Sequence, residues 1–217
     1  MKKIAIANIK GGCGKTTIAT NFSCLTAGEN KKTILIDADT QGSSMKFRAE
    51  RPEIAPQFQA VSILQNTIHK DINDFSSEFV FIDAGGRDNE IFRSALMAVD
   101  SIIIPITPSQ YDIWSSENTF KMVKEIKYMY EEIKEIKVAI VLNMVIAGTS
   151  LSKEAEEVMD EYIKTYDLHL FNNVLYSRVA YKESVSEGLG VTEMKGEKYK
   201  KASDEMMSLY KEVMEWV

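Results

Sequence analysis

Short apolar segments alternate along the chain with longer segments in which apolar residues recur about every 3.6 positions. The short segments are mostly rich in Ile and Val, as strands buried on both faces are, and they cover residues 4–7, 33–36, 79–82, 102–106, 138–142 and 170–175. The periodic segments predict helices over residues 16–27, 90–98, 116–133 and 152–166. This alternation predicts an α/β fold with a mainly parallel sheet flanked by helices on both faces, and ligands at the carboxyl ends of the strands.

The segment between residues 51 and 77 has a weaker pattern. Residues 58–61 indicate a further strand and residues 64–75 a further helix, although Pro52 and Pro56 interrupt the approach to them. The chain contains no internal repeat, low-complexity tract or linker. Its 217 residues, 45% of them hydrophobic, can form a sizeable core. We therefore expect one domain covering residues 1–217.

Charge and cysteine content exclude several classes of protein. The 26 Lys and Arg residues against 32 Asp and Glu residues give a net charge of −6, which argues against a generally cationic nucleic-acid-binding surface. Cys13 and Cys24 form no C-x-x-C pair, which argues against a zinc site or a disulfide framework. These features favour a protein of the reducing cytoplasm.

Neither a secretion signal nor a membrane-spanning segment is indicated. The first apolar run is interrupted by Asn8 and Lys10, and we interpret it as a buried strand. The longest uncharged apolar stretches, such as residues 101–106 and 138–142, are much shorter than the roughly 20 residues that a spanning helix needs. We expect a soluble protein.

A glycine-rich loop directly follows the first predicted strand and leads into a helix. Its backbone N–H groups can surround phosphate oxygens, and the helix N-terminus adds positive potential. A lysine can contact the outer phosphates and a threonine hydroxyl can bind Mg²⁺. The candidate nucleotide-binding residues of this loop are Gly11, Gly12, Cys13, Gly14, Lys15, Thr16 and Thr17.

The loop departs from the ordinary G-x-x-x-x-G-K-[ST] pattern because Ile9 occupies the position of the first glycine. It reads K-G-G-x-G-K-T-T instead, which is the deviant Walker A loop, and the chain resembles the ParA/MinD family of ATPases over nearly its whole length. The resemblance implies a P-loop NTPase fold of the deviant Walker A type, with ATP and Mg²⁺ as cofactors and hydrolysis of ATP to ADP and phosphate as the reaction.

Two carboxylates, Asp37 and Asp39, end the second predicted strand. Residues two apart on an extended chain lie on one face, so both side chains can approach the phosphate loop. The resemblance implies that Asp39 orients the attacking water and belongs to the metal site, although Thr40 replaces the proline that the family usually has next. The alternative is that the two aspartates only stabilise a turn.

The apolar segment 79–82 is followed by Asp83, as in a Walker B element. Such an aspartate helps to hold Mg²⁺ together with Thr16. Gly85 and Gly86 follow and permit a close approach of the backbone to the outermost phosphate. Because any strand can end in aspartate, the assignment of Asp83 depends on the assignment of the loop.

Three further residues enter through the resemblance. It implies that Lys10 crosses to the nucleotide of a partner subunit in an ATP-dependent homodimer, much as an arginine finger does. Lys10 is therefore a candidate catalytic residue beside Lys15 and Asp39, and the alternative is an exposed surface lysine. The resemblance also suggests base contacts for Asn143 and for Pro108 after the segment 102–106. For Asn143 the alternative is a turn former.

The C-terminal segment has a helical apolar stripe that includes Met206, Leu209, Tyr210 and Val213. Its polar side is mostly acidic, and an anionic membrane would repel it. We expect this stripe to pack against the domain, and we expect no membrane partner.

Local basic patches are the candidates for DNA contact. Nonspecific binding to phosphates requires clustered Lys and Arg side chains, and a dimer would double any such patch. Similarity to a DNA-contacting segment of the family and local clustering select Arg178, Lys182, Lys195, Lys198, Lys200 and Lys201. The alternative is a solvated basic face.

The resemblance therefore implies a ParA-type ATPase of a plasmid or chromosome partition system. Such a protein dimerises on ATP, binds DNA nonspecifically and hydrolyses ATP when a centromere-binding, ParB-type partner stimulates it. The expected localisation is cytoplasmic and nucleoid-associated. Two alternatives remain: a MinD-like or cargo-positioning ATPase that acts on a membrane or protein scaffold, and an ATP-dependent biosynthetic enzyme of the amidoligase kind.

Overall fold

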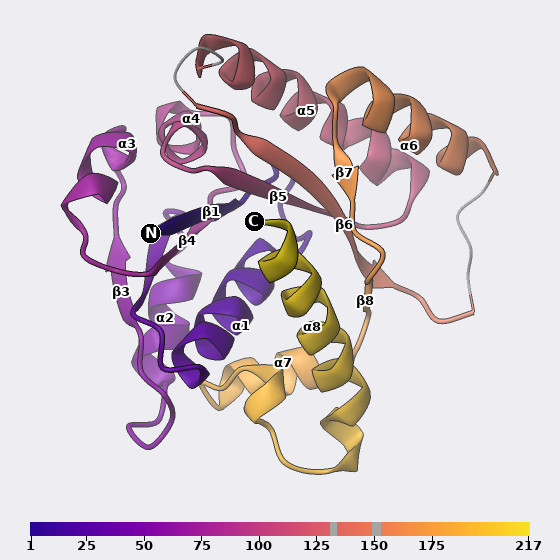
Figure 1. Cartoon of the computed structure of the whole chain (residues 1–217). Helices are drawn as coiled ribbons and strands as arrows, with labels where there is room; N and C mark the ends of the chain where they lie inside the picture. The colour runs from indigo at the N-terminus through magenta and orange to yellow at the C-terminus, as the bar shows by residue number, and fades with distance from the viewer. Residues whose placement is uncertain (131–133, 149–152) are drawn as a thin grey trace.

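The computed structural model describes residues 1–130, 134–148 and 153–217, in which strands and helices alternate (Figure 1). The strands are β1 (Lys2–Ile6), β2 (Thr33–Ala38), β3 (Gln59–Ser62), β4 (Phe79–Ala84), β5 (Ser101–Ile106), β6 (Lys137–Val145), β7 (His169–Leu170) and β8 (Leu175–Tyr176). The α-helices are α1 (Lys15–Gly28), α2 (Ser43–Glu50), α3 (Ile68–Asp71), α4 (Glu90–Met97), α5 (Gln110–Tyr130), α6 (Lys153–Tyr166), α7 (Val179–Ser186) and α8 (Glu197–Trp216). Short 3₁₀ helices cover Ile72–Asp74 and Val191–Glu193.

The strands form one sheet with the order β3-β2-β4-β1-β5-β6-β7, and β8 also pairs with β6. Every strand pairing within the described residues is parallel. The sequence predicted a mainly parallel sheet, and this prediction is confirmed. Because all strands run the same way, their carboxyl ends meet at one edge of the sheet, where an α/β fold binds its ligands.

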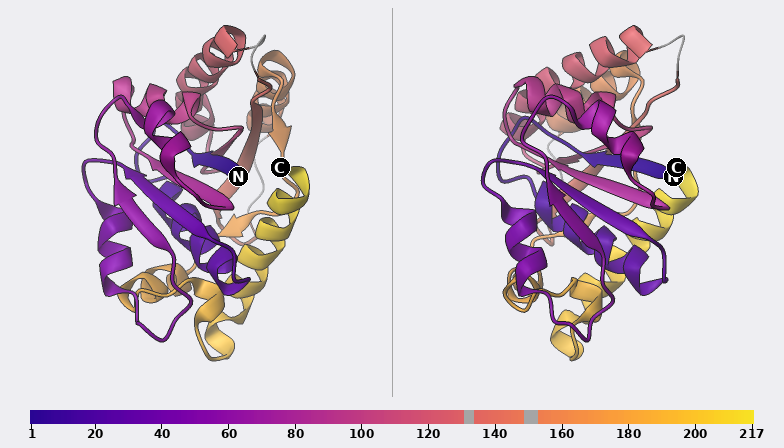
Figure 2. Two further views of the ribbon diagram at one scale, coloured as in Figure 1. Left: turned by 60° about the vertical axis from the view of Figure 1, so that its left-hand side comes forward. Right: turned by 90° about the vertical axis from the view of Figure 1, so that its left-hand side faces the viewer.

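Helices cover both faces of the sheet, as Figures 1 and 2 show from three directions. Alternation along β1 directs Ile4 and Ile6 into a core under α1, α2, α7 and α8, and Ala5 into a second core under α3, α4, α5 and α6. Both cores are continuous and buried. The central strands are therefore apolar on both faces, which explains why their sequences are runs of Ile and Val without alternation.

The predicted strand over residues 170–175 is wrong as a continuous element. It divides into β7 and β8, which pair with different parts of β6. Between them the backbone and side-chain amides of Asn172 and Asn173 donate to the carboxylate of Glu212 at 2.7–2.9 Å. Because these amides bond to α8, they make no ladder bonds and the strand is interrupted.

The helix predictions also need correction. Within residues 64–75 only Ile68–Asp71 is α-helical, and a 3₁₀ turn follows it. The helix α2 was not predicted, because Ser44 and Phe47 are its only buried residues and it has no apolar stripe. The predicted helices 116–133 and 152–166 correspond to α5 and α6, but α5 begins earlier than predicted, at Gln110. Residues 131–133 and 152 lie outside the described residues.

The C-terminal stripe packs against the domain as predicted. Met206, Leu209, Tyr210 and Val213 of α8 are buried, and the ring of Tyr210 lies edge-on to Phe22 of α1 at 5.5 Å between centroids. Across the described parts of the chain, no helix combines the length and the apolar character needed to cross a bilayer.

Candidate nucleotide-binding site

The carboxyl edge of the sheet gathers the candidate residues. β4 lies between β1 and β2, and its last residues bring Asp83 into register with Ile6 on one side and Asp37 on the other. The glycine-rich loop leaves β1 at this edge and leads directly into α1. Strand order therefore brings the phosphate loop after β1 close to Asp83 of β4 and to the aspartates at the end of β2, as the sequence predicted.

The conformation of the loop requires glycine at two positions. Gly12 and Gly14 have φ angles of 77° and 94°, in the left-handed region that L side chains rarely adopt. A Cβ added to Gly14 would lie 2.0 Å from Nδ2 of Asn143. The glycines thus let the chain turn tightly into α1 while Asn143 approaches the loop from β6.

Lys15 is buried at the start of α1, and its ammonium points back across the loop. Its Nζ donates to the carbonyl oxygen of Lys10 at 2.9 Å and lies 4.0 Å from Sγ of Cys13. A phosphate above the loop would offer this ammonium charged acceptors in place of one neutral carbonyl.

Thr16, Ser44 and Asp83 form a cluster of oxygen atoms, in which Ser44 and Asp83 are buried and Thr16 is half-buried. The hydroxyls of Thr16 and Ser44 each donate to Oδ2 of Asp83 at 2.7 Å. Burial raises the pKa of Asp83 to about 6, and the two hydroxyls oppose this rise. Hydroxyl and carboxylate oxygens are the ligands that Mg²⁺ prefers, and this ion is usually held by few protein ligands plus the substrate phosphates. The cluster fits Mg²⁺ that arrives with a nucleotide.

The described part of the chain contains no group of three or more His, Cys, Asp or Glu side chains that could hold a metal ion. The candidate metal site is therefore one that a nucleotide would complete.

The two aspartates after β2 have different surroundings. Asp37 is fully buried and accepts hydrogen bonds from the backbone N–H groups of Asp39 and Met45 at 3.1 and 3.0 Å. It joins the end of β2 to the first turn of α2. Asp39 is half-buried, and its Oδ1 accepts from the N–H of Gln41 at 3.0 Å. Both therefore stabilise the turn, and the Asp39 carboxylate has the greater access to solvent.

The glycines after β4 connect Asp39 to the phosphate loop. A Cβ on Gly85 would lie 3.7 Å from Cγ of Asp39, and a Cβ on Gly86 would lie 3.4 Å from Nζ of Lys15. The backbone at residues 85–86 thus passes between the candidate water-orienting carboxylate and the candidate phosphate-binding ammonium.

Asn143 is buried beneath the loop, and its Nδ2 donates to the carbonyl oxygen of Cys13 at 2.7 Å. It also borders a cleft of about 510 Å³ whose wall includes Thr17, Met144, Tyr176, Arg178, Tyr181 and Lys182. This cleft adjoins the first turn of α1, where a base attached to a loop-bound phosphate could reach. Pro108 lies in the segment between β5 and α5, half-buried, and it is not part of this wall.

Lys10 makes an ion pair with Asp112 in the first turn of α5. The start of the loop is also fixed to this helix: Nδ2 of Asn8 donates to Oγ of Ser116 at 3.3 Å, and the N–H of Ile9 donates to the hydroxyl of Thr119 at 3.1 Å. Lys10 is therefore held at the junction of the phosphate loop and α5.

The candidate DNA-contacting residues divide into two groups. Arg178 pairs with Glu205, and Lys198 pairs with Glu183 at 2.8 Å, so two of the six cations are partly neutralised within the chain. The other four make no ion pair among the described residues and are exposed: Lys182, Lys195, Lys200 and Lys201.

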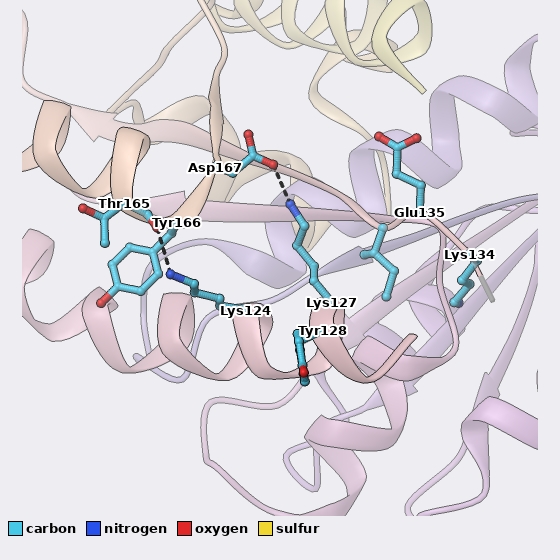
Figure 3. A pocket seen from close by; sticks show the side chains of 9 residues that line it. Lys124, Lys127, Tyr128, Lys134, Glu135, Thr165, Tyr166 and Asp167 are labelled. Carbon is cyan, nitrogen blue, oxygen red and sulfur yellow. Dashed lines mark hydrogen bonds and ion pairs between the residues drawn. The ribbon is translucent and has the colours of Figure 1, made fainter. Parts of the chain in front are cut away.

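A separate groove of about 350 Å³ lies between the end of α5 and the α6–β7 turn (Figure 3). Its lysines are used internally: Lys127 pairs with Asp167 at 2.9 Å, and Lys124 donates to the carbonyl oxygen of Thr165 at 3.2 Å. The wall of the groove includes Ile136, which directly precedes β6, so the groove lies near the edge of the sheet where this strand begins. The phosphate loop lies at the opposite edge, where the strands end. The groove is therefore remote from the candidate nucleotide site.

Sequence reasoning did not select three residues that contact this site. Asn8, Ser44 and Asp112 were missed because each acts through a partner far away in the chain: Ser116, Asp83 and Lys10, respectively. Only Asn8 gave a local signal, as a polar residue ending a buried strand. Nothing in the sequence near Ser44 or Asp112 indicates its partner.

Comparison with known proteins identifies the family. Residues 4–191 match the CobQ/CobB/MinD/ParA nucleotide binding domain. The chain is 28% identical to the maintenance of carboxysome distribution protein A of Halothiobacillus neapolitanus, over 97% of this chain and 95% of that protein. It is 23% identical to the chromosome-partitioning ATPase Soj of Thermus thermophilus, over 58% and 63% of the two chains.

Solved structures of McdA from Cyanothece have the same fold. The apo form has a TM-score of 0.76 at 18% identity, covering 96% of this chain and 98% of that one. The ATP complex of an McdA variant has a TM-score of 0.73 at 17% identity, covering 98% and 96%. With the family match spanning most of its length, this chain belongs to the CobQ/CobB/MinD/ParA family of nucleotide-binding domains.

Proposed function

We propose that this protein is a ParA-type ATPase that dimerises on ATP, binds DNA nonspecifically and resets by hydrolysis, and that it segregates DNA with a centromere-binding partner. The observation that carries the ATPase is the convergence of Lys15, Thr16 and Asp83 at the carboxyl edge of a parallel sheet, with Asp39 across residues 85–86. Family membership supports nucleotide binding by the same loop.

Each residue of the site would have a distinct part. The N–H groups of Gly12 to Thr17 and the ammonium of Lys15 would hold the phosphates. The oxygens of Thr16 and Asp83 would hold Mg²⁺, with Asp39 close by, and the ion would neutralise charge on the outer phosphates. Asp39 would accept a hydrogen bond from the attacking water and fix its direction.

Lys10 would act across a dimer. Its own loop already has Lys15 for the phosphates, and the ammonium of Lys10 is paired with Asp112 of α5. In the proposed dimer it would leave Asp112 and meet the charge that develops on the partner's outermost phosphate.

The DNA surface proposed for the dimer consists mainly of the exposed, unpaired cations. Lys195 precedes α8, Lys200 and Lys201 lie in its first two turns, and Lys182 lies on α7, which contacts α8. Phosphate contacts of this kind give binding that is independent of sequence and weakens steeply with salt.

A second candidate cargo is favoured by one comparison. The carboxysome-distribution relative matches over nearly all of both chains, whereas the partition ATPase Soj matches over about 60% of each. In this alternative the same ATP-dependent dimer would position a protein particle instead of a DNA centromere.

The test of the proposed function is binding of random duplex DNA at one fixed salt concentration with ADP, with ATP and without nucleotide. We expect binding with ATP only, and its loss in a triple variant of Lys195, Lys200 and Lys201 to alanine. A control triple variant of Lys70, Lys153 and Lys164, which are exposed elsewhere, removes the same charge and should bind normally. Absence of DNA binding in every nucleotide state would contradict the proposal and favour a scaffold, membrane or biosynthetic role.

The cargo is tested in the source organism by deleting the gene. Loss of a replicon from dividing cells would support DNA segregation. Clustering of a protein particle with normal replicon inheritance would support the second candidate.

A further inference from the structure

Ser44 is a buried polar residue on a helix with little buried surface. Only two of the eight residues of α2 are buried, Ser44 and Phe47. Phe47 packs into the apolar core under α1, α2, α7 and α8. Ser44 has no exposed surface, and its Oγ donates to Oδ2 of Asp83 at 2.7 Å. A buried hydroxyl needs a hydrogen-bond partner, and here that partner is the candidate Mg²⁺ ligand at the end of β4.

One oxygen of Asp83 accepts hydrogen bonds from two helices. Thr16 donates to Oδ2 from the first turn of α1, and Ser44 donates to the same oxygen from the first turn of α2, each at 2.7 Å. Carboxylates that bind metal are commonly oriented by such hydrogen bonds from groups that do not touch the ion. Thr16 is itself a proposed ligand of Mg²⁺, so Ser44 is the donor whose contribution is orientation alone.

Ser44 also fixes the turn that carries Asp39. Residues 39–45 are attached to two neighbouring strands through two buried carboxylates. Asp37 of β2 accepts from the N–H groups of Asp39 and Met45 at 3.1 and 3.0 Å, and Asp83 of β4 accepts from Ser44. Asp37 and Asp83 are partners in the register of the two strands. The place of Asp39 relative to the candidate Mg²⁺ ligand is therefore set in part by the hydroxyl of Ser44.

We propose that Ser44 is a positioning residue that orients Asp83 for Mg²⁺ and joins the turn carrying Asp39 to the metal site. The inference rests on the proposed function, in which Asp83 would hold Mg²⁺ and Asp39 would orient the attacking water. The bond makes these two tasks depend on each other, because the carboxylate of Asp83 is fully oriented only while α2 is in place. The chain thus assembles its metal ligand and its water-orienting carboxylate together.

The experiment compares the wild-type chain with Ser44→Ala in the binding of a fluorescent, non-hydrolysable ATP analogue. Affinity is measured with Mg²⁺ and with EDTA, and the ratio of the two is the gain that the metal confers. We expect this gain to fall by about 10-fold or more in Ser44→Ala, as is usual when a group that orients a metal ligand is lost. Affinity in EDTA should be unchanged, because the phosphate loop is intact.

Two control variants on the same helix separate the hydroxyl from the packing of α2. Ser43→Ala removes the same group from the preceding residue, which is exposed, and it should match the wild type. Phe47→Leu weakens the packing of the other buried residue without changing the bond to Asp83. It should unfold at a lower urea concentration and keep the gain from Mg²⁺. An equal loss of this gain in Phe47→Leu and Ser44→Ala would overturn the role of the hydroxyl.

Hydrogen exchange of the backbone amides tests the connection to Asp39 directly. In the wild type, residues 39–50 should gain protection when Mg²⁺ is added to the chain with the bound ATP analogue. In Ser44→Ala this gain should be lost, while residues 11–17 of the phosphate loop remain protected by the nucleotide. If Ser44 only supported the helix, its loss would raise exchange in α2 by the same factor with Mg²⁺ and with EDTA, and that result would contradict the proposal.

The outcomes separate the role of Ser44 from the proposed function. A wild-type chain whose affinity for the ATP analogue is the same with Mg²⁺ and with EDTA overturns the metal site and the role of Ser44 together. A wild-type chain that gains affinity with Mg²⁺, beside a Ser44→Ala variant that gains as much, overturns the role of Ser44 alone.

Discussion

Asn143 and Cys13 are 130 positions apart, and the side chain of Asn143 donates from Nδ2 to the carbonyl oxygen of Cys13 at 2.7 Å. This bond directs one carbonyl of the phosphate loop toward β6 and fixes the loop from below. It gives Asn143 a contact with the loop itself, in addition to its position beside the cleft where a base could lie.

Asn143→Ala should weaken the binding of ATP and of inorganic tripolyphosphate to a similar degree, by about 10-fold, because a buried carbonyl loses its donor and the loop loses its support. Isothermal titration calorimetry measures both affinities, with Asn118→Ala on the exposed face of α5 as control. Weaker binding of ATP with unchanged binding of tripolyphosphate would show instead that Asn143 acts through the base.

Lys15→Ala should lower ATP affinity by at least about 100-fold, since the variant loses charge-assisted hydrogen bonds to the phosphates. Lys10→Ala should bind ATP normally as a monomer and fail in hydrolysis, because its proposed target belongs to the partner. Titration of a fluorescent ATP analogue, combined with phosphate release, distinguishes the two. Equal loss of ATP affinity in both variants would contradict the separation of their roles.

Asp39→Ala should retain ATP binding and dimerisation while hydrolysis falls by about 100-fold or more, because only the group that orients water is removed. Single-turnover phosphate release and ultracentrifugation measure these properties on the same sample. Full hydrolysis by this variant would rule out the role proposed for Asp39. A loss of folding, detected by circular dichroism, would instead identify a structural role for its bond to Gln41.

Asp83 should make stability depend on pH in the absence of metal and nucleotide. Burial raises its pKa from 3.8 to about 6, so the folded chain holds this proton more tightly than the unfolded chain does. The contribution of Asp83 to stability is therefore greatest below about pH 4 and is lost as pH rises through about 6, by on the order of 3 kcal/mol.

Asp83→Asn removes that ionisation. Urea unfolding at pH 5 and pH 8 should show the variant gaining stability relative to the wild type at the higher pH, while Mg²⁺-dependent ATP binding is lost. The same relative stability at both pH values would contradict the assigned pKa. Asp88→Asn, which changes an exposed carboxylate, serves as the control.

Arg51 should be among the most important charged residues for stability. Its buried guanidinium pairs with Glu193 at 2.6 Å and donates to Sγ of Cys24 at 3.0 Å and to the carbonyl oxygen of Gly188 at 3.1 Å. Arg51→Ala should lower the free energy of unfolding by about 3–5 kcal/mol, because it leaves a carboxylate without its partner. Arg93→Ala, which breaks an exposed pair with Asp88, should cost less than about 1 kcal/mol. Similar losses in denaturant titrations of both variants would contradict this account.

Much of the fold and the phosphate loop could be predicted because their signals are local. An uncharged run rich in Ile, such as residues 102–106, indicates a strand buried on both faces. Gly12 and Gly14 mark positive φ angles, and Lys15 and Thr16 follow at fixed spacing in the next helical turn. The helix α2 and the interrupted strand at residues 170–175 gave no such signal, because Asp37 and Glu212 define them through contacts from other elements.

The sequence by itself thus determined the alternation of strands and helices, the phosphate-binding chemistry of the loop, and the aspartates at the ends of the strands. Only the tertiary structure decided that Ser44 joins Thr16 at Asp83, that Asn143 supports the loop, and that Lys10 pairs with Asp112 of α5. The physical reason is that each of these contacts joins residues far apart along the chain, so it depends on strand order and helix packing, whereas the loop's chemistry depends on the spacing of a few neighbouring residues.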